Sequence, residues 1–369
     1  MGIFALTQIG RGHFSEVYSC RGADGHPTGR ALKVSKTASS LDSIKEGQAG
    51  TEAWALLLGE MSALAGGLSP FVRVMPQMIL LAVPVERDQY ASVLLMEEGL
   101  RTATDDVAKL ARGVHFPNGS FSPPGLKAAG QFFKEVLGPL SILHSLDIAH
   151  RDLKPANMLR DKDNFLVLSD AGMAVFPTLL HMPVPSPGAS PPTPSMRPPI
   201  ASARARSLLL SSAGPTAVSR SPPANQATRV TIHINPTELQ TIFSRQFRNR
   251  DNAGTHVFAG PEFPFARRKG AMTSKDFLPG DMWAVGWIFL QILSGYNIRW
   301  MESSEEKSML ANSSPQDFWV KHLHRTGTPS MDPAVLCAID LVRGLLKARP
   351  EERLTCSAAL AHPFLLSRA

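Results

Sequence analysis

The sequence predicts an α+β fold in which the strands come first and most of the helices follow. Short runs of alternating apolar residues flank residues 9–17, and residues 93–99 form a further strand-like run that ends at a turn. Residues 281–290 are almost continuously apolar, as a helix buried on every side requires, and this run is too short to cross a membrane. A chain of 369 residues that is 43% hydrophobic can bury one large core or two packed lobes.

Apolar periodicity predicts two further helices. Residues 51–65 carry a single apolar stripe and are followed by two glycines. The stripe consists of Ala53, Leu56, Leu57, Met61 and Leu64. Residues 126–146 are also strongly apolar, but Gly138 and Pro139 interrupt them. Because proline lacks a backbone donor and clashes with the preceding turn, we expect a kink or a break there.

The most informative motif lies in the middle of the chain. Residues 150–157 are His-Arg-Asp-Leu-Lys-Pro-Ala-Asn, and Asp-Ala-Gly follows at 170–172. These residues supply a proton acceptor, a cation and two metal ligands, the set that phosphoryl transfer requires. The eight-residue string resembles the catalytic loop of the eukaryotic protein kinases. The resemblance implies that Asp152 is the catalytic base, that Lys154 neutralises phosphate, and that Asn157 and Asp170 hold Mg²⁺.

The N-terminal residues carry a second part of the resemblance. Residues 9–17 are similar to the glycine-rich loop of that family, with Ser15 where a third glycine is common, and residues 31–34 are similar to its third strand. Residues 93–99 resemble its fifth strand and hinge. The resemblance implies that Lys33 holds the α- and β-phosphates of ATP. The implied nucleotide-binding residues are Ile9, Gly10, Arg11, Gly12, Val17, Ala31, Lys33, Glu60, Met96, Glu97 and Leu159.

In this family the phosphate-binding lysine pairs with a glutamate on the next helix. Glu52 and Glu60 both lie in the predicted helix 51–65. We choose Glu60, because residues 68–72 then follow the helix as they do in the family on the way to its fourth strand.

The C-terminal half supplies further matching positions. Residues 254–262 resemble the end of the activation segment of the family, with Gly260 in place of the usual alanine. Glu262 is expected to form a buried ion pair with Arg353. Residues 281–290 resemble the central helix of the large lobe. The resemblance implies structural or regulatory roles for His150, Arg151, Ala171, Gly172, Thr255, Glu262, Asp281 and Arg353.

The resemblance extends over residues 4–366 and implies a bilobal protein-kinase-like fold. The N-lobe, about residues 1–98, would hold a small antiparallel sheet with one main helix. The C-lobe, about residues 99–369, would be larger and mostly helical.

Residues 177–250 form a basic insert rich in Pro, Ser and Arg within the activation segment, and we expect disorder up to about residue 228. Its tail predicts a strand at 230–234 and a helix from Asn235.

The positive charge of the chain is local. Residues 177–254 carry eight arginines, no lysine and two acidic residues, a net charge of +6 against +7 for the whole chain. This argues against nucleic acid as a partner and indicates contact with an acidic partner, although a solvated loop without a partner is the simpler interpretation. Serine or threonine precedes proline four times in the insert, so a regulatory kinase is a further possible partner. These residues are Ser186, Ser190, Thr193 and Ser221.

The cysteines and the N-terminus indicate an intracellular protein. Cys20, Cys337 and Cys356 show neither paired nor metal-binding spacing, which favours a reducing compartment, the cytoplasm first and the nucleus second. The first residues have neither the apolar stretch of a signal peptide nor a myristoylation signal, and we expect a soluble protein without a membrane span.

A few residues in and near the motifs narrow the substrate class. Lys154, Gly254 and Thr255 resemble the serine/threonine branch of the family, so the expected partner is a protein with a Ser or Thr acceptor. Ala156 and Gln291 stand where members that prefer arginine-rich peptides carry acids, so we expect no basic-peptide preference.

The alternative is a nucleotide-binding scaffold without useful catalysis that acts through its basic insert. Ala171 and the insert motivate this alternative. Retention of Lys33, Asp152, Asn157 and Asp170 argues against it.

Ala171 yields the first testable prediction. Family members usually carry Phe there, and loss of a phenyl group from a core costs about 3–5 kcal/mol unless neighbours such as Met173 repack. We therefore expect activation to depend more strongly on a partner or on phosphorylation. Ala171→Phe should raise the phosphotransfer rate of the purified protein without any partner, and equal rates for the two proteins would contradict this.

Overall fold

The computed structural model describes residues 5–11, 15–38, 79–86, 89–116, 118–145, 147–170, 173–175, 255–263, 274–295, 301, 303–323 and 332–366. The described residues divide into two compact units, one up to Glu98 and one from Gly99 onward. We call them the sheet unit and the helical unit. The predicted helix at 51–65, the insert at 177–250 and the elements predicted in its tail lie outside the described residues.

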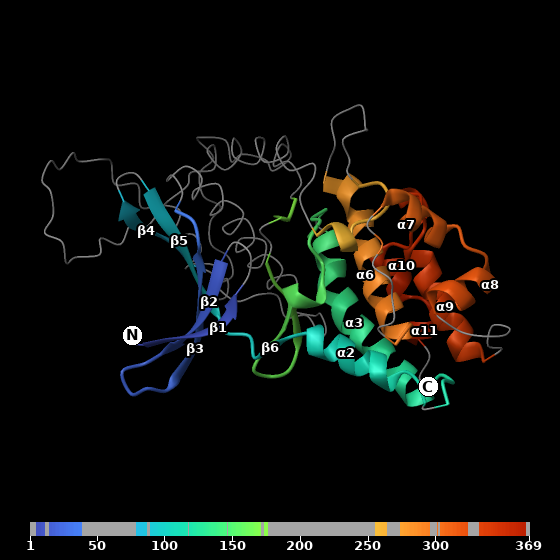
Figure 1. The fold of residues 1–369 in the computed structure, drawn as a ribbon, viewed down its shortest axis with the longest axis horizontal. Coiled ribbons are helices and arrows are strands. Elements are labelled where there is room, and N and C mark those ends of the chain that lie inside the picture. The colour runs from blue at the N-terminus through green and yellow to red at the C-terminus, as the bar shows by residue number, and fades with distance from the viewer. Residues whose placement is uncertain are drawn as a thin grey trace, which may run out of the picture. The chain divides into compact units, whose positions relative to one another are not determined.

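The sheet unit is a five-stranded antiparallel sheet with the strand order β1-β2-β3-β5-β4 (Figure 1). The strands are β1 (Ala5–Arg11), β2 (Ser15–Arg21), β3 (Pro27–Ser35), β4 (Ile79–Glu86) and β5 (Gln89–Glu97). The β2–β3 turn needs Gly25, whose φ of 75° lies in the left-handed region and whose N–H donates to the Gly22 carbonyl. The alternating apolar runs therefore form strands, as predicted.

The helical unit contains all the helices that the structure describes, together with a small three-stranded sheet of order β6-β7-β8. Its strands are β6 (Arg101–Thr102), β7 (Met158–Arg160) and β8 (Leu166–Leu168). Its α-helices are α2 (Thr104–Gly113), α3 (Pro123–Ser145), α6 (Leu278–Leu293), α7 (Ser304–Ala311), α8 (Pro315–Asp317), α9 (Pro333–Leu345), α10 (Cys356–Leu360) and α11 (Pro363–Leu366). Short 3₁₀ turns are η2 (Pro155–Asn157), η5 (His256–Phe258), η7 (Ser274–Phe277) and η9 (Pro350–Glu352), and η8 (Phe318–His322) is a π-helix.

Helix α6 is the centre of the helical unit. Every residue from Asp281 to Leu293 is buried, and the helix contacts α2, α3 and α9 (Figure 1). Gly286 allows the close approach of α9, because a Cβ there would lie 2.8 Å from the Leu345 Cβ. The largest buried side chains include Trp283, Trp287 and Phe289 of this helix. The helix buried on all sides that the apolar run predicts is present.

Helix α3 corrects one prediction. The predicted break at Gly138 and Pro139 is wrong, because α3 continues over 23 residues with Pro139 inside it. The alternative, a kink at these residues, stays a prediction. Ten of its residues are buried, Pro139 among them, so the packing of the helix outweighs the hydrogen bond that proline cannot make. The Ser141 hydroxyl donates to the Gly138 carbonyl and supplies a polar contact at this position.

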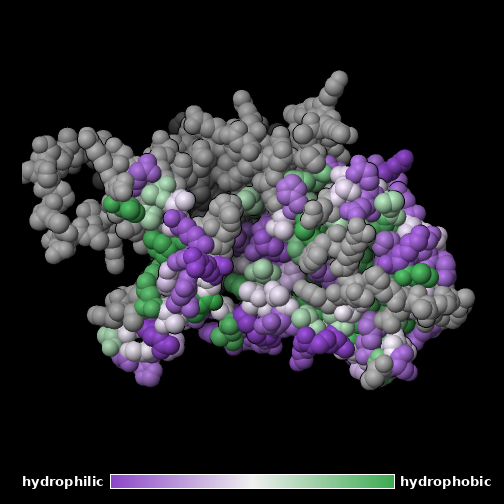
Figure 2. All heavy atoms as spheres, in the orientation of Figure 1, coloured by the Kyte–Doolittle hydropathy of each residue, from purple (hydrophilic) through white to green (hydrophobic). Residues whose placement is uncertain are grey.

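Hydrophobic side chains reach the surface in small groups, as the space-filling view shows for one face (Figure 2). In the sheet unit the large exposed ones are Leu6, Ile9 and Val85. Of the helices that the structure describes, none combines the length and apolarity needed to cross a membrane. The α+β fold, with an antiparallel sheet before a mostly helical part, is confirmed.

The three thiols yield a prediction about reactivity. Cys20 and Cys356 are buried and Cys337 is half-buried, and burial raises the pKa of both the Cys20 and the Cys356 thiol. Thiolate is the reactive form, so we expect Cys337 of the folded protein to react with Ellman's reagent at least about tenfold faster than the other two. All three should react in denaturant. Cys337→Ser should remove the fast phase, and a fast phase of two or more thiols would contradict the prediction.

Candidate active site

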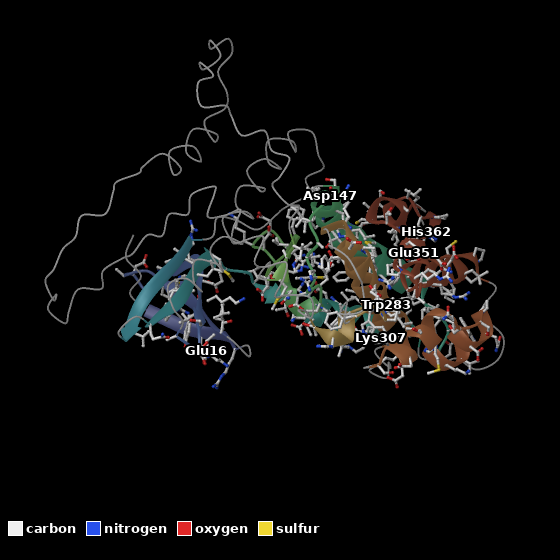
Figure 3. The ribbon with its side chains drawn as sticks, turned by 90° about the horizontal axis from the view of Figure 1, so that it is seen from above. Glu16, Asp147, Trp283, Lys307, Glu351 and His362 are labelled. Carbon is white, nitrogen blue, oxygen red and sulfur yellow. The ribbon has the colours of Figure 1, made fainter. Side chains whose placement is uncertain are left out.

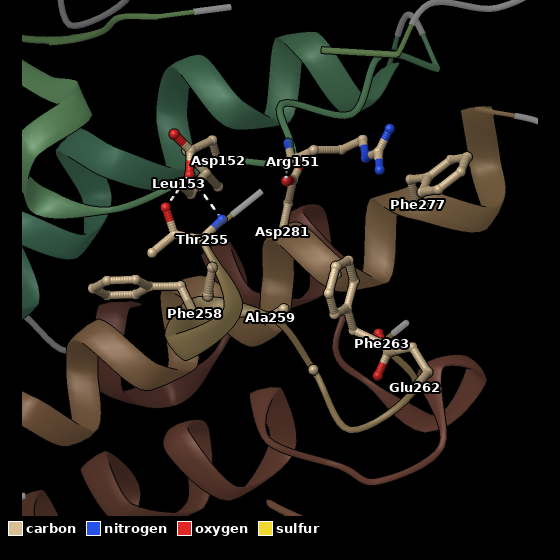
Figure 4. A pocket seen from close by; sticks show the side chains of 13 residues that line it. Arg151, Asp152, Leu153, Thr255, Phe258, Ala259, Glu262, Phe263, Phe277 and Asp281 are labelled. Carbon is tan, nitrogen blue, oxygen red and sulfur yellow. Dashed lines mark hydrogen bonds between the residues drawn. The ribbon is translucent and has the colours of Figure 1, made fainter. Parts of the chain in front are cut away.

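The loop of residues 150–157 is bound to α6 through one buried carboxylate. Asp281, 1% exposed, accepts the His150 backbone N–H at 2.7 Å. It also accepts the Arg151 backbone N–H at 2.8 Å (Figure 4). The ring of His144 adds a contact of 3.1 Å to the same carboxylate. Arg151 has a φ of 66°, in the left-handed region, a conformation that costs a non-glycine residue about 1–2 kcal/mol. The two charge-assisted bonds at Asp281 hold the loop in this conformation.

His150 connects this loop to the strand that leads to Asp170. Its ring is fully buried, and Nε2 lies 3.0 Å from the Ser169 carbonyl oxygen, so this nitrogen must donate. Nδ1 then accepts the backbone N–H of Asp152 at 3.4 Å. One neutral tautomer satisfies both contacts and orients the backbone on each side.

The carboxylate of Asp152 is surrounded by donors from three other residues. Its Oδ1 accepts the Thr255 backbone N–H at 3.1 Å and the Thr255 hydroxyl at 2.5 Å, drawn as dashed lines in Figure 4. Its Oδ2 accepts from Lys154 Nζ at 2.8 Å and from Asn157 Nδ2 at 2.7 Å. Lys154 Nζ also donates to the Thr255 hydroxyl at 2.8 Å. The structure therefore brings Asp152, Lys154, Asn157 and Thr255 together.

The two candidate metal ligands, Asn157 and Asp170, flank the β7–β8 hairpin. Asn157 precedes β7, and its carbonyl accepts both the N–H and the hydroxyl of Ser169, each at 2.8 Å. Asp170 comes next, in a left-handed conformation with a φ of 62°. Because both donor contacts of the Asn157 amide nitrogen go to Asp152, its Oδ1 is the atom left to bind a cation. Amide and carboxylate oxygens suit Mg²⁺, so the donor set fits this ion.

A buried arginine that the sequence motifs did not single out fixes the far end of β7. Arg160 donates from Nε to Asp106 at 2.7 Å and also forms an ion pair with Glu135. It further donates to the Asn164 carbonyl at 3.0 Å. These contacts tie β7 to α2 and α3. No signal near Arg160 in the sequence reveals its partners, which lie 25 and 54 residues away.

The described residues just before the insert and those just after it pack in one hydrophobic cluster. Val175 exchanges two backbone hydrogen bonds with Ala149, at 2.8 and 3.0 Å. Ala149 and Val175 form a cluster with Phe263 and Phe277, and Ala259 packs against it. We call residues 255–263 the returning segment. Its last residue, Phe263, lies in the same cluster as Val175.

Glu262 of the returning segment forms a two-point ion pair with Arg353. The two pairs of atoms lie 2.7 and 2.5 Å apart, and the arginine side chain is 1% exposed. Arg353 also donates to the carbonyls of Lys347 and Pro279 and stacks over the Trp283 ring at 5.0 Å. With every part of the guanidinium engaged, this pair fixes the end of the returning segment.

A pocket lies between the 150–157 loop, the returning segment and α6 (Figure 4). Arg151 reaches over it toward Phe277, and its guanidinium carbon lies 4.4 Å from that ring's centroid. The sequence motifs do not predict this cation–π contact, because Phe277 lies outside all of them.

The candidate nucleotide residues of the sheet unit lie on neighbouring strands. Val17 pairs with Lys33, and Ala31 pairs with Met96. Ile9 and Gly10 lie near the end of β1, and Arg11 contacts Glu16 at 3.4 Å (Glu16 is labelled in Figure 3). Leu159 belongs to the helical unit, where it lies against Gly99. Gly12, Glu60, Ala171 and Gly172 lie outside the described residues, and Glu97 is described only by its backbone.

Comparison with known families agrees with this geometry. A model described as protein kinase domain matches residues 4–178 and 239–365, well over half of the chain. The chain belongs to the protein kinase family. Protein kinases use ATP and a divalent metal and act on protein substrates. The matched ranges leave out residues 179–238, which lie within the basic insert.

Individual relatives are similar at low identity. MAP kinase kinase kinase wis4 of Schizosaccharomyces pombe is 25% identical over 231 residues, which is 63% of this chain and 12% of the relative. A protein kinase of Oryza sativa subsp. indica is 25% identical over 276 residues, 69% of this chain and 42% of the relative. CBL-interacting protein kinase 5 of Oryza sativa subsp. japonica is 41% identical over 49 residues, 13% of this chain and 11% of the relative. The chain thus spans less than half the length of these kinases.

Gly260 of this kinase gives a prediction about stability. A Cβ at this position would lie 2.3 Å from Glu262 Oε2, so a side chain would force the carboxylate away from Arg353. Gly260→Ala should lower the free energy of unfolding by about 1–3 kcal/mol, measured by chemical denaturation.

Gly280→Ala in α6 is the matched control. A Cβ at Gly280 would meet nothing within 4 Å, and alanine favours a helix over glycine by up to about 1 kcal/mol. Equal stabilities for the two variants would show that the approach of Glu262 to Gly260 does not limit the choice of residue.

Proposed function

We propose that this kinase transfers the γ-phosphoryl group of ATP to Ser or Thr hydroxyls of proteins, with Asp152 as the catalytic base. The observation that carries the proposal is the hydrogen bond from the Thr255 hydroxyl to Asp152 Oδ1. It supports a site that can orient an aliphatic hydroxyl, the group that a Ser or Thr acceptor presents. Lys154 lies beside both groups and supplies a positive charge.

In the proposed reaction the acceptor oxygen attacks the γ-phosphorus while the bond to the leaving ADP oxygen breaks. The hydroxyl proton passes to an Asp152 carboxylate oxygen. Lys154 offsets the negative charge that the transferred group carries. Thr255 and Asn157 keep the carboxylate in place, so most of the rate gain comes from positioning and charge.

The cofactor roles are part of the same proposal. Asn157, through Oδ1, and Asp170 would hold Mg²⁺, which would supply positive charge to offset the negative charge of the phosphates. We assign Lys33 to the α- and β-phosphates, with Glu60 as its partner, on the resemblance alone. The strand pairing of Val17, Ala31 and Met96 is compatible with an adenine site.

We further propose an intracellular location, cytoplasmic before nuclear, and the three free cysteines support a reducing compartment. An acidic partner or a regulatory kinase that acts on residues 177–250 also remains a proposal. It is supported by the arginines of that stretch and by its Ser-Pro and Thr-Pro pairs.

Asp152→Asn tests the catalytic role. The amide keeps the size of the side chain but is a far weaker proton acceptor, so kcat for transfer of labelled phosphate to casein should fall at least about 10²-fold. The Kd for ATP should change little, because Asp152 is assigned to the acceptor.

Asp163→Asn, an exposed aspartate in the β7–β8 turn, should leave both constants unchanged. Undiminished transfer by Asp152→Asn would remove Asp152 from its assigned role. Wild-type protein that binds ATP but phosphorylates nothing would instead favour the scaffold alternative.

A further inference from the structure

Lys307 is a buried charge that the proposed reaction does not use. It lies on the inner face of α7, is 3% exposed and is labelled in Figure 3. Among the lysines that the structure describes, only Lys307 is buried. Lysine is almost never fully buried without a partner, because removing its ammonium group from water is costly. Such a residue therefore requires an explanation.

The contacts of Lys307 join α7 to the returning segment. Its Nζ donates to the His256 carbonyl oxygen at 2.6 Å, one residue beyond Thr255. At the other end of the segment, the Ser304 hydroxyl donates to the Phe263 carbonyl at 3.1 Å. A capping box formed by Ser303 and Glu306 fixes the first turn of α7. Through Lys307 and Ser304, α7 thus contacts the returning segment near both of its ends.

The charge of Lys307 is retained at a cost to stability. Burial lowers the pKa of Lys307, and the negative charge of nearby Glu262 opposes this only in part. The unfolded chain therefore binds the proton more tightly than the folded chain. At a pH below the pKa of Lys307 in the folded chain, the buried ammonium lowers the free energy of unfolding by its full amount. This destabilisation decreases as the pH rises from the pKa of the folded chain to that of the unfolded chain. A neutral apolar side chain would avoid this cost.

We infer that Lys307 is a positioning residue for the protein substrate, which holds the returning segment so that Thr255 meets Asp152. This inference rests on the proposed function. The side chains that follow Thr255 are His256, which is exposed, and Val257 and Phe258, which are half-buried. These side chains lie next to the hydroxyl-orienting group, so a protein that presents its Ser or Thr there must lie against them.

Without Lys307, the segment would keep only part of this support. The His256 carbonyl would still accept the Ala259 N–H at 3.2 Å, so the substitution does not leave that oxygen without a donor. Glu262 would keep its pair with Arg353. We therefore expect a fold that survives and a segment that is held less firmly beside Asp152.

Lys307→Met in the full chain tests the inference. Methionine is similar in length to lysine and fills the same space without the charge, so the midpoint temperature of thermal unfolding should stay the same or rise. The KM for casein should rise about tenfold, the scale of a lost hydrogen bond to a charged donor. The KM for ATP and the slow hydrolysis of ATP without casein should stay within about twofold, because this residue touches neither reacting group.

Two matched variants complete the experiment. Lys307→Arg keeps a cation and should retain a KM for casein closer to that of the wild type than the methionine variant does. Lys321→Met removes an exposed lysine of η8, whose partner is Asp317, and should change nothing. In addition, amide hydrogen exchange over residues 255–263 should be faster in Lys307→Met than in the wild type.

The outcomes separate the inference from the proposed function. An unchanged KM for casein together with unchanged exchange over residues 255–263 would overturn the role of Lys307. A lower unfolding midpoint with equal losses in casein transfer and ATP hydrolysis would also overturn it, because that pattern marks a purely structural residue. Absence of casein phosphorylation by the wild type would sink the proposed function, and the exchange measurement would then still decide whether Lys307 holds the segment.

Discussion

The geometry of the candidate site depends on the burial of the Asp281 carboxylate in the helical unit. A buried carboxylate is costly unless donors surround it, and here they are two consecutive backbone N–H groups and a histidine ring. Because α6 is enclosed by other helices, the carboxylate cannot move toward water to escape this cost. The loop of residues 150–157 is therefore held to a helix whose residues 281–293 are all buried, and this attachment fixes the position of Asp152.

A second constraint acts on the other side of Asp152. The returning segment is fixed at Glu262 by Arg353, and along its length by the carbonyl contacts of α7. Thr255 is where this segment meets the loop held by Asp281. Two separately anchored pieces of backbone thus meet at one carboxylate. A shift of either piece would displace the hydrogen bonds of Asp152.

The sequence predicted the elements whose signals are local. The apolar run of α6, the alternating strands and the motif at residues 150–157 each depend on neighbouring residues, and each corresponds to a described element. The break at Pro139 was wrong because the rule applied was local, whereas ten buried residues of α3 hold the helix together. The partners of Arg160, Lys307 and Phe277 are distant in sequence and carry no pattern of their own. Only the folded chain reveals them.

The hydrophobic cluster around Ala149 and Val175 has a consequence for the length of the chain between its anchors. Val175 and Phe263, which lie on the two sides of this stretch, both belong to the cluster. Closing a flexible chain between two fixed points costs only roughly 0.6 kcal/mol more for each doubling of its length. A change in the number of residues between Val175 and Phe263 is therefore expected to cost little closure entropy.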